Sequence, residues 1–215
     1  MRSELLKRIL SSILLISLII YLIIEGSYLF TLFLIICFFL SLYEWQRMSK
    51  NIIYKYLGVI FLFISFYSVY QIRFSFGNEY YPLFFILIIC VSTDIGGFLF
   101  GKILKGPKLT KISPNKTYAG VIGSYILSLL SIFIYFKYIN NSNFNEFTGV
   151  SIFFVIIFST VSQIGDLIIS YFKRQSDIKN TGNIIPGHGG LLDRIDGMIF
   201  AFPLYYLLIL FGYFL

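Results

Sequence analysis

Charged residues are scarce in this chain, since Asp, Glu, Lys and Arg make up only 13% of its 215 residues, against about 25% in soluble domains. So few charges cannot solvate a 24.9 kDa globule, which excludes a soluble domain and a disordered chain. The only two cysteines, Cys37 and Cys90, lie within apolar runs, so small hydrophobic fillers are favoured and a disulfide scaffold is excluded. Hydrophobic residues make up 58% of the chain. With a mean hydropathy of +0.84, this composition predicts an integral membrane protein.

The apolar residues form seven runs of about 16 to 21 residues, each long enough to cross about 30 Å of hydrocarbon as a helix. Backbone polar groups in lipid must be paired within their own segment, and the runs lack the alternating polarity of barrel strands. The sequence therefore predicts an all-α, polytopic transmembrane protein with about seven spans. The runs cover residues 9–24, 28–44, 53–71, 83–100, 119–139, 150–170 and 197–215.

Basic residues alternate between the two sides of these spans. Of the 17 Lys and Arg residues, 15 lie in or beside the N-terminus, the 45–52 turn and the 101–118 and 171–196 loops, and only Arg73 and Lys137 lie on the other side. Cytoplasmic connections are enriched in Lys and Arg. We therefore expect the N-terminus and these three connections to be cytoplasmic and the C-terminus to lie outside.

Asp94 stands inside a predicted span, in the sequence STDIGGFLFGK. Gly97 and Gly101 continue a stripe of small residues along the same helix face, and such stripes favour close helix packing. An acid within a membrane is costly, so Asp94 is instead a candidate for a functional role.

Polar residues recur at spacings of three and four in the sixth run, which places them on one helix face. That face cannot point at lipid, so it meets other helices or a polar cavity. A carboxylate beside cations suits a divalent metal with phosphate oxygens, although Lys173 and Arg174 alone would also fit as positive-inside anchors. The residues are Ser159, Gln163, Asp166, Ser170, Lys173 and Arg174.

The loop NTGNIIPGHGGLLDRIDG combines glycines with titratable residues. Glycines such as Gly189 and Gly190 permit the close backbone approach of a phosphate cradle. Asp193 and Asp196 are three residues apart and can share a face that holds a metal, with Arg194 toward a phosphate. Two other interpretations stay open. In one, the only histidine, His188, is an ordinary loop residue, and in the other the two acids complement the dipole of the last helix.

The 101–118 loop carries five lysines. These lysines would attract anionic lipid head groups, or Ser113, Lys116 and Thr117 would contact a polyphosphate.

These residues together resemble the signature of the phosphatidate cytidylyltransferase (CDP-diacylglycerol synthase) family, and the resemblance covers Asp94 to about Met198. The chain departs from the family pattern at Asn180, Asn115 and Ala119, where the family usually has Asp, Lys and Glu. The matching positions are Asp94, Ser113, Pro114, Lys116, Thr117, Ser170, Lys173, Arg174, Lys179, Gly182, Ile185, Pro186, His188, Gly189, Gly190, Asp193, Arg194 and Asp196.

The resemblance implies that the protein transfers CMP from CTP to phosphatidate with Mg²⁺ as cofactor. It also implies a site at the cytoplasmic face of a bacterial inner membrane. A homodimer is suggested, and no nucleic-acid partner is expected. We expect residues 1–82 to form an N-terminal region of three spans and residues 83–215 a catalytic region of four. Another CTP-dependent lipid transferase or kinase, or an ion-coupled transporter, is the alternative.

The expected site divides into three sets of residues. Asp166 and Asp193 are expected to hold the metal, with Asp196 and Asp94 as further candidates. Lys173 and Arg174 complete the catalytic set. The expected substrate-binding residues are Ser113, Lys116, Thr117, Ser170, Lys179, His188, Gly189, Gly190, Arg194 and Asp196.

Overall fold

The computed structural model describes residues 16–75, 79–110, 112–138, 149–182 and 189–213, and helices dominate these ranges, as the all-α prediction requires. The expected site residue His188 lies outside the described residues. The helices are α2 (Tyr28–Met48), α3 (Ile52–Phe74), α4 (Tyr81–Leu104), α5 (Tyr118–Tyr138), α6 (Gly149–Gln175), α7 (Leu192–Ile195) and α8 (Met198–Leu210), with a further apolar helix at Ile16–Glu25.

Five helices, α2 to α6, are long and apolar enough to cross a membrane, and they correspond to the second through sixth predicted runs. The helices at the first and last runs are shorter. α8 has 13 residues, which at 1.5 Å per residue is about 20 Å, less than the hydrocarbon thickness. The structure thus establishes a multi-pass helical membrane protein, while the total of seven spans stays a prediction.

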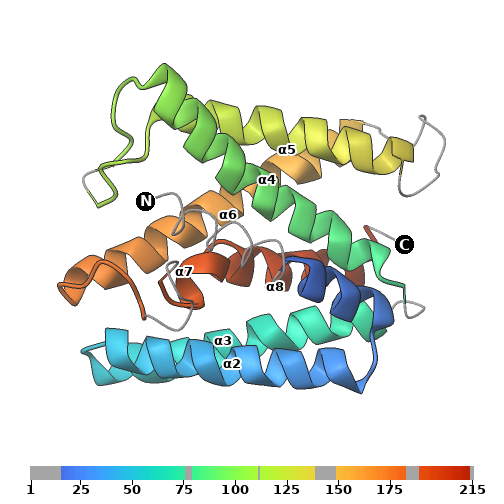
Figure 1. Cartoon of the computed structure of the whole chain (residues 1–215), viewed down its shortest axis with the longest axis horizontal. Coiled ribbons are helices and arrows are strands. Elements are labelled where there is room, and N and C mark those ends of the chain that lie inside the picture. The colour runs from blue at the N-terminus through green and yellow to red at the C-terminus, as the bar shows by residue number, and fades with distance from the viewer. Residues whose placement is uncertain (1–15, 76–78, 111, 139–148, 183–188, 214–215) are drawn as a thin grey trace, which may run out of the picture.

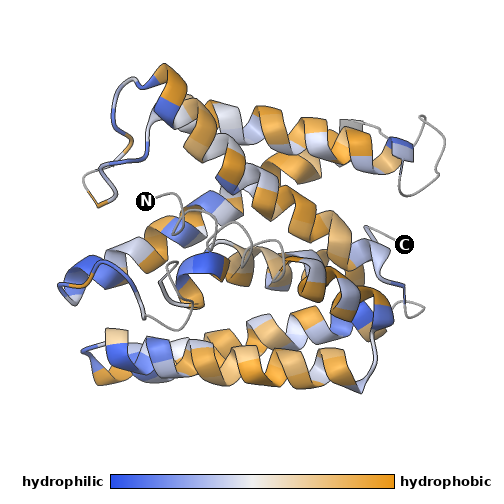
Figure 2. Cartoon of the chain, viewed as in Figure 1, coloured by the Kyte–Doolittle hydropathy of each residue, from blue (hydrophilic) through white to orange (hydrophobic). Residues whose placement is uncertain are grey.

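The outward surfaces of the helices are apolar, and Figure 2 shows orange residues along the lengths of the helices with blue gathered mainly at their ends. Phe39, Phe63 and Phe98 each expose more than half of their surface. Such exposure is expected where the surrounding solvent is lipid rather than water.

The helices form a layered bundle in which α2 and α3 lie along one edge and α5 along the other. α4 crosses the bundle diagonally from the α5 edge, and α6, α7 and α8 lie between the edges (Figure 1). Small residues allow α4 and α5 to approach closely, because a Cβ at Gly120 would lie 2.8 Å from the carbonyl oxygen of Gly97. The small-residue stripe of α4 is therefore a packing surface, as one of the two interpretations of the sequence held.

The connections that carry most of the cations meet at one end of the bundle. Lys50 forms an ion pair of 3.1 Å with Asp177, and the Nε of Arg174 donates to the carbonyl of Ile112 over 3.4 Å. These contacts join the turn after α2, the loop after α4 and the segment after α6 (Figure 1). The predicted clustering of these three connections on one side is confirmed.

Arg73 is one of the two cations at the opposite end, but it is not a surface charge. Its side chain is buried, with 2% of the residue exposed, and it donates to the carbonyl oxygens of Ile23 (2.7 Å) and Ile24 (3.0 Å). Arg73 therefore pairs carbonyl groups at the C-terminal end of the first helix, which otherwise lack partners.

Candidate active site

The polar face of α6 meets other protein segments along its length, as predicted. Near the middle of the helix, Ser159 accepts a hydrogen bond of 2.9 Å from Thr93 of α4. One turn before the end, Ser170 donates to Asp166 over 3.2 Å. The face therefore packs on α4 at its deeper part and reaches the loop end at Asp166 and Ser170.

Lys116 from the 101–118 loop reaches Asp166. Its Nζ lies 2.6 Å from Asp166 Oδ2 and 3.4 Å from the carbonyl oxygen of Gln163. The loop is shaped for this approach, since Ser113 and Lys116 form a turn through a backbone hydrogen bond of 3.1 Å and Thr117 accepts from the N–H of Gly120 at the start of α5. Ser113 and Thr117 thus shape the loop that presents Lys116.

Asp196 lies close enough to Asp166 for the two carboxylates to interact electrostatically. Burial and then the nearby Asp166 carboxylate raise the pKa of Asp196 well above its usual range. The segments come this close because Gly197 has no side chain, and a Cβ there would lie 2.7 Å from the carbonyl oxygen of Ser162. Asp166, Asp196 and Lys116 therefore form one cluster.

Asp193 joins three segments through hydrogen bonds. It accepts from Lys173 Nζ (2.9 Å), the N–H of Thr181 (2.9 Å) and the N–H of Gly190 (3.1 Å). Burial alone would raise the pKa of Asp193, but these donors and the Lys173 charge outweigh burial and lower it. Asp193 is thus a carboxylate that links the end of α6 to both sides of the glycine-rich segment.

The expected metal pair of Asp166 and Asp193 is not joined by these interactions. Asp166 contacts Lys116 and Asp193 contacts Lys173, while Lys173 also interacts electrostatically with Asp196. Among the residues that the structure describes, no group of three or more His, Cys, Asp or Glu side chains is arranged to hold a metal. Asp94 lies on α4, where it interacts electrostatically with Asp166 and Lys116.

Three of the expected phosphate-binding cations are exposed at this end of the bundle. Lys179 and Arg194 are exposed, and so is Arg174, which also donates to the carbonyl of Ile178 over 3.5 Å. Exposed cations beside the carboxylate cluster would meet an anionic ligand arriving from the aqueous side.

Glu44 of α2 also belongs to this region, although the sequence analysis did not single it out. Only 1% of the residue is exposed, and its carboxylate accepts from the hydroxyl of Thr181 (2.7 Å) and from the N–H groups of Leu191 and Leu192 (2.8 Å each). The sequence did contain a signal for Glu44, because it is an acid near the end of an apolar run. The same signal identified Asp94 and Asp166.

A polar cavity of about 260 Å³ lies next to this segment and is lined by Arg47, Ile178, Asn180, Thr181 and Gly182. Arg47 was likewise not singled out from the sequence. The cavity places a second arginine, from α2, beside the signature residues that follow α6.

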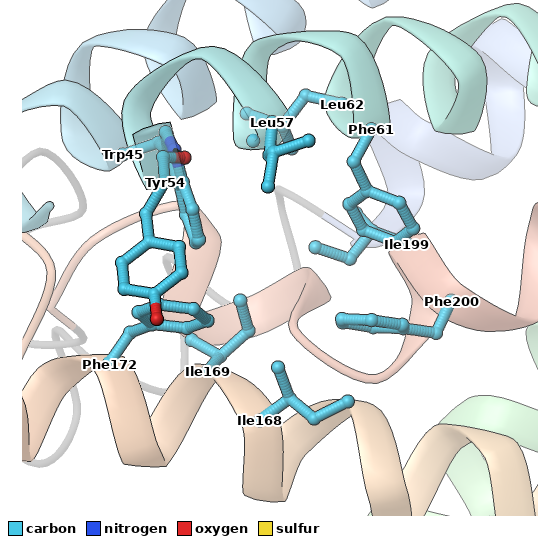
Figure 3. Close-up of a pocket in the computed structure, with 11 residues that line it drawn as sticks. Trp45, Tyr54, Leu57, Phe61, Leu62, Ile168, Ile169, Phe172, Ile199 and Phe200 are labelled. Atoms are coloured by element: carbon cyan, nitrogen blue, oxygen red, sulfur yellow. Dashed lines mark hydrogen bonds between the residues drawn. The ribbon is translucent and has the colours of Figure 1, made fainter. Parts of the chain in front are cut away.

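A second cavity, of about 260 Å³, has an apolar lining. Figure 3 shows side chains from α2, α3, α6 and α8 around a shared space, among them Trp45, Phe61, Ile169 and Phe200. Ile169 directly precedes Ser170, and Ile199 follows Asp196 by three residues. The apolar and polar sites are therefore built on the same two segments of chain.

The fold and the site together define a multi-pass membrane protein with a carboxylate- and lysine-lined site at one end of its helices, next to an apolar cavity. Residues 52–211 match the model of the cytidylyltransferase family. The chain belongs to this family.

Curated relatives extend the similarity over nearly the whole chain. A phosphatidate cytidylyltransferase of Rickettsia typhi is 35% identical over 93% of this chain and 89% of that protein. One of Rickettsia bellii is 37% identical over 94% and 90%. One of Helicobacter pylori is 35% identical over 64% of this chain, and there the match spans half of the longer relative.

Proposed function

We propose that this chain is a phosphatidate cytidylyltransferase, which converts CTP and phosphatidate to CDP-diacylglycerol and pyrophosphate. The observation that carries the proposal is the similarity to relatives of that name over about nine tenths of their length. The site supports it, because cations, carboxylates and an apolar cavity occur together.

The reaction joins two anions. A phosphate oxygen of phosphatidate attacks the α-phosphorus of CTP, the bond from that phosphorus to the β-phosphate oxygen breaks, and pyrophosphate leaves with the electron pair. Such a transfer requires positioning and neutralisation of charge. Lys116 and Lys173 are held in place by Asp166 and Asp193, and the exposed Arg174 and Arg194 add charge at the aqueous side.

Mg²⁺ is the cofactor we propose, and the described carboxylates fit it. The carboxylates of the half-buried Asp166 and the buried Asp196 lie near each other, and Mg²⁺ is usually held by one or two carboxylates together with phosphate oxygens of the substrate. The bound ion would neutralise phosphate charge. The contacts favour Asp196 over Asp193 as the partner of Asp166, with Asp94 nearby.

The apolar cavity suits the acyl chains of a lipid whose phosphate lies at the carboxylate cluster. Its lining residues come from the same parts of α6 and α8 that adjoin Ser170 and Asp196. The cation distribution supports a cytoplasmic site in a bacterial inner membrane. The homodimer remains an expectation from the family resemblance.

A labelling assay tests the proposed function. With CTP labelled at the α-phosphate, the purified protein should place label in chloroform-soluble lipid only when phosphatidate is added. Lipid labelled instead from γ-labelled CTP would identify a CTP-dependent lipid kinase. If neither label enters lipid, the proposal is wrong and a carrier becomes the better interpretation.

A further inference from the structure

We infer that Glu44 is a positioning residue for the segment around Gly189 and Gly190, which the sequence predicts to be a phosphate cradle and which we take as the CTP side of the site. The inference rests on the proposed function. Glu44 belongs to α2 and precedes the residues 52–211 that match the family model. The carboxylate lies between the two ends of a segment that begins at Thr181 and ends at Leu192.

The three donors to Glu44 come from both ends of this segment. Thr181 donates its hydroxyl to Oε2, Leu191 donates its N–H to Oε1, and Leu192 donates its N–H to Oε2. The N–H groups at the start of a helix have no partner within the helix, and Leu191 has no polar side chain to serve α7 itself. Glu44 therefore supplies from another helix what a local capping residue usually supplies.

The same segment holds the side chains of the site. The N–H of Thr181 donates to Asp193 Oδ2, and Asp193 accepts from Lys173 through Oδ1. Glu44 thus holds both Thr181, whose N–H donates to Asp193, and Leu192, which directly precedes Asp193 in the chain. Displacement of either contact would move the lysine and carboxylate that face the substrate.

Gly190 shows how tightly the segment is packed against this carboxylate. A Cβ on Gly190 would collide with the Thr181 hydroxyl and would lie 2.5 Å from Glu44 Oε2. The absence of a side chain at Gly190 therefore allows the Glu44 contacts to form, which gives this signature glycine a physical role.

Replacement of Glu44 by Gln tests the inference, because the amide keeps the shape but turns an NH₂ group toward N–H or O–H donors. We expect the KM for CTP to rise at least about fivefold, with the KM for phosphatidate within about twofold of wild type. Ser41→Ala is the matched control. Ser41 lies one turn earlier on α2, is buried, and its hydroxyl has no hydrogen-bond partner among the described residues, so its removal should change neither KM.

Thr181→Val provides a second variant that loses only the hydroxyl partner. Thr181→Val should also raise the KM for CTP. Because Thr181→Val and Glu44→Gln remove the same contact, the KM for CTP of the double variant should rise by less than the product of the two single increases. If Glu44→Gln does not fold, Thr181→Val decides alone, and an unchanged KM for CTP in that variant overturns the inference.

Two results with active wild-type protein contradict the positioning role. The first is unchanged kinetics of Glu44→Gln. The second is a lower kcat with both KM values unchanged, which would indicate only a smaller active fraction. An inactive wild-type protein would overturn the proposed function itself and this inference with it.

Discussion

Lys173 and Asp193 form an ion pair of 2.9 Å between the end of α6 and α7, with side chains only 11% and 10% exposed. Since Asp193 also accepts two backbone N–H groups, this single carboxylate holds Lys173, Thr181 and Gly190 in one arrangement.

Asp193→Asn should lower turnover at least about 100-fold, or about 2.7 kcal/mol, and should also lower thermal stability. The substitution leaves Lys173 buried opposite a neutral amide, and an unpaired buried charge is destabilising. Adding Lys173→Met removes that charge and should restore much of the stability without restoring activity. Thermal unfolding and the CTP assay measure the two effects separately, and a double variant no more stable than Asp193→Asn would refute this account.

Asp166→Asn and Asp196→Asn should each reduce turnover at least about 100-fold and raise the Mg²⁺ concentration for half-maximal activity, since each removes one proposed metal ligand. Asp177→Asn is the control. Its carboxylate forms an exposed ion pair with Lys50, so activity and Mg²⁺ dependence should stay within about twofold of wild type. If Asp166→Asn or Asp196→Asn kept more than about half of the activity, that residue would not be a metal ligand.

Lys116→Ala should lower turnover by more than about tenfold, because it removes the cation 2.6 Å from Asp166 beside the proposed phosphate site. Lys102→Ala is a matched loop-end control. Lys102 is exposed and lies over the Phe98 ring, so its loss should reduce activity less than about threefold. Initial rates at saturating CTP compare the two, and equal effects would show that Lys116 has no special role.

Cysteines introduced at Ser113 and Ser176 should react with a membrane-impermeant maleimide only from the cytoplasmic face, and one at Asn141 only from the opposite face. The expectation follows from the cation distribution and from contacts that place the segments of Ser113 and Ser176 at one end of the bundle. The native Cys37 and Cys90 are buried, which limits background. Labelling of Ser113 and Ser176 positions from opposite faces would contradict both the topology and the shared site.

Asn180→Asp should change activity within about tenfold, or about 1.4 kcal/mol, because the amide oxygen of Asn180 still accepts hydrogen bonds. Asn180 lines the polar cavity beside Thr181, so we expect the effect mainly in the KM for CTP. A wild-type protein inactive on phosphatidate but active as Asn180→Asp would show that the family aspartate is essential at this position.

The sequence by itself determined the membrane location, the all-α fold, the family and the positions of α2 to α6, which correspond to five of its seven predicted spans. Apolar run length and helical periodicity are local properties, so they are visible in the residues that form each helix. The signature residues around Lys173 and Asp193 were likewise visible because they stand at fixed spacing in one stretch of chain.

Only the tertiary structure decided which of these residues meet. Lys116 reaches the backbone of Gln163 across 47 residues, and Glu44 reaches Leu192 across 148 residues. Such partners depend on how the helices cross and on glycines that let them approach, which no local pattern encodes. For the same reason only the structure showed that the packing of Gly197 against α6 brings Asp196 near Asp166, and the expected metal pair of Asp166 and Asp193 stays a prediction.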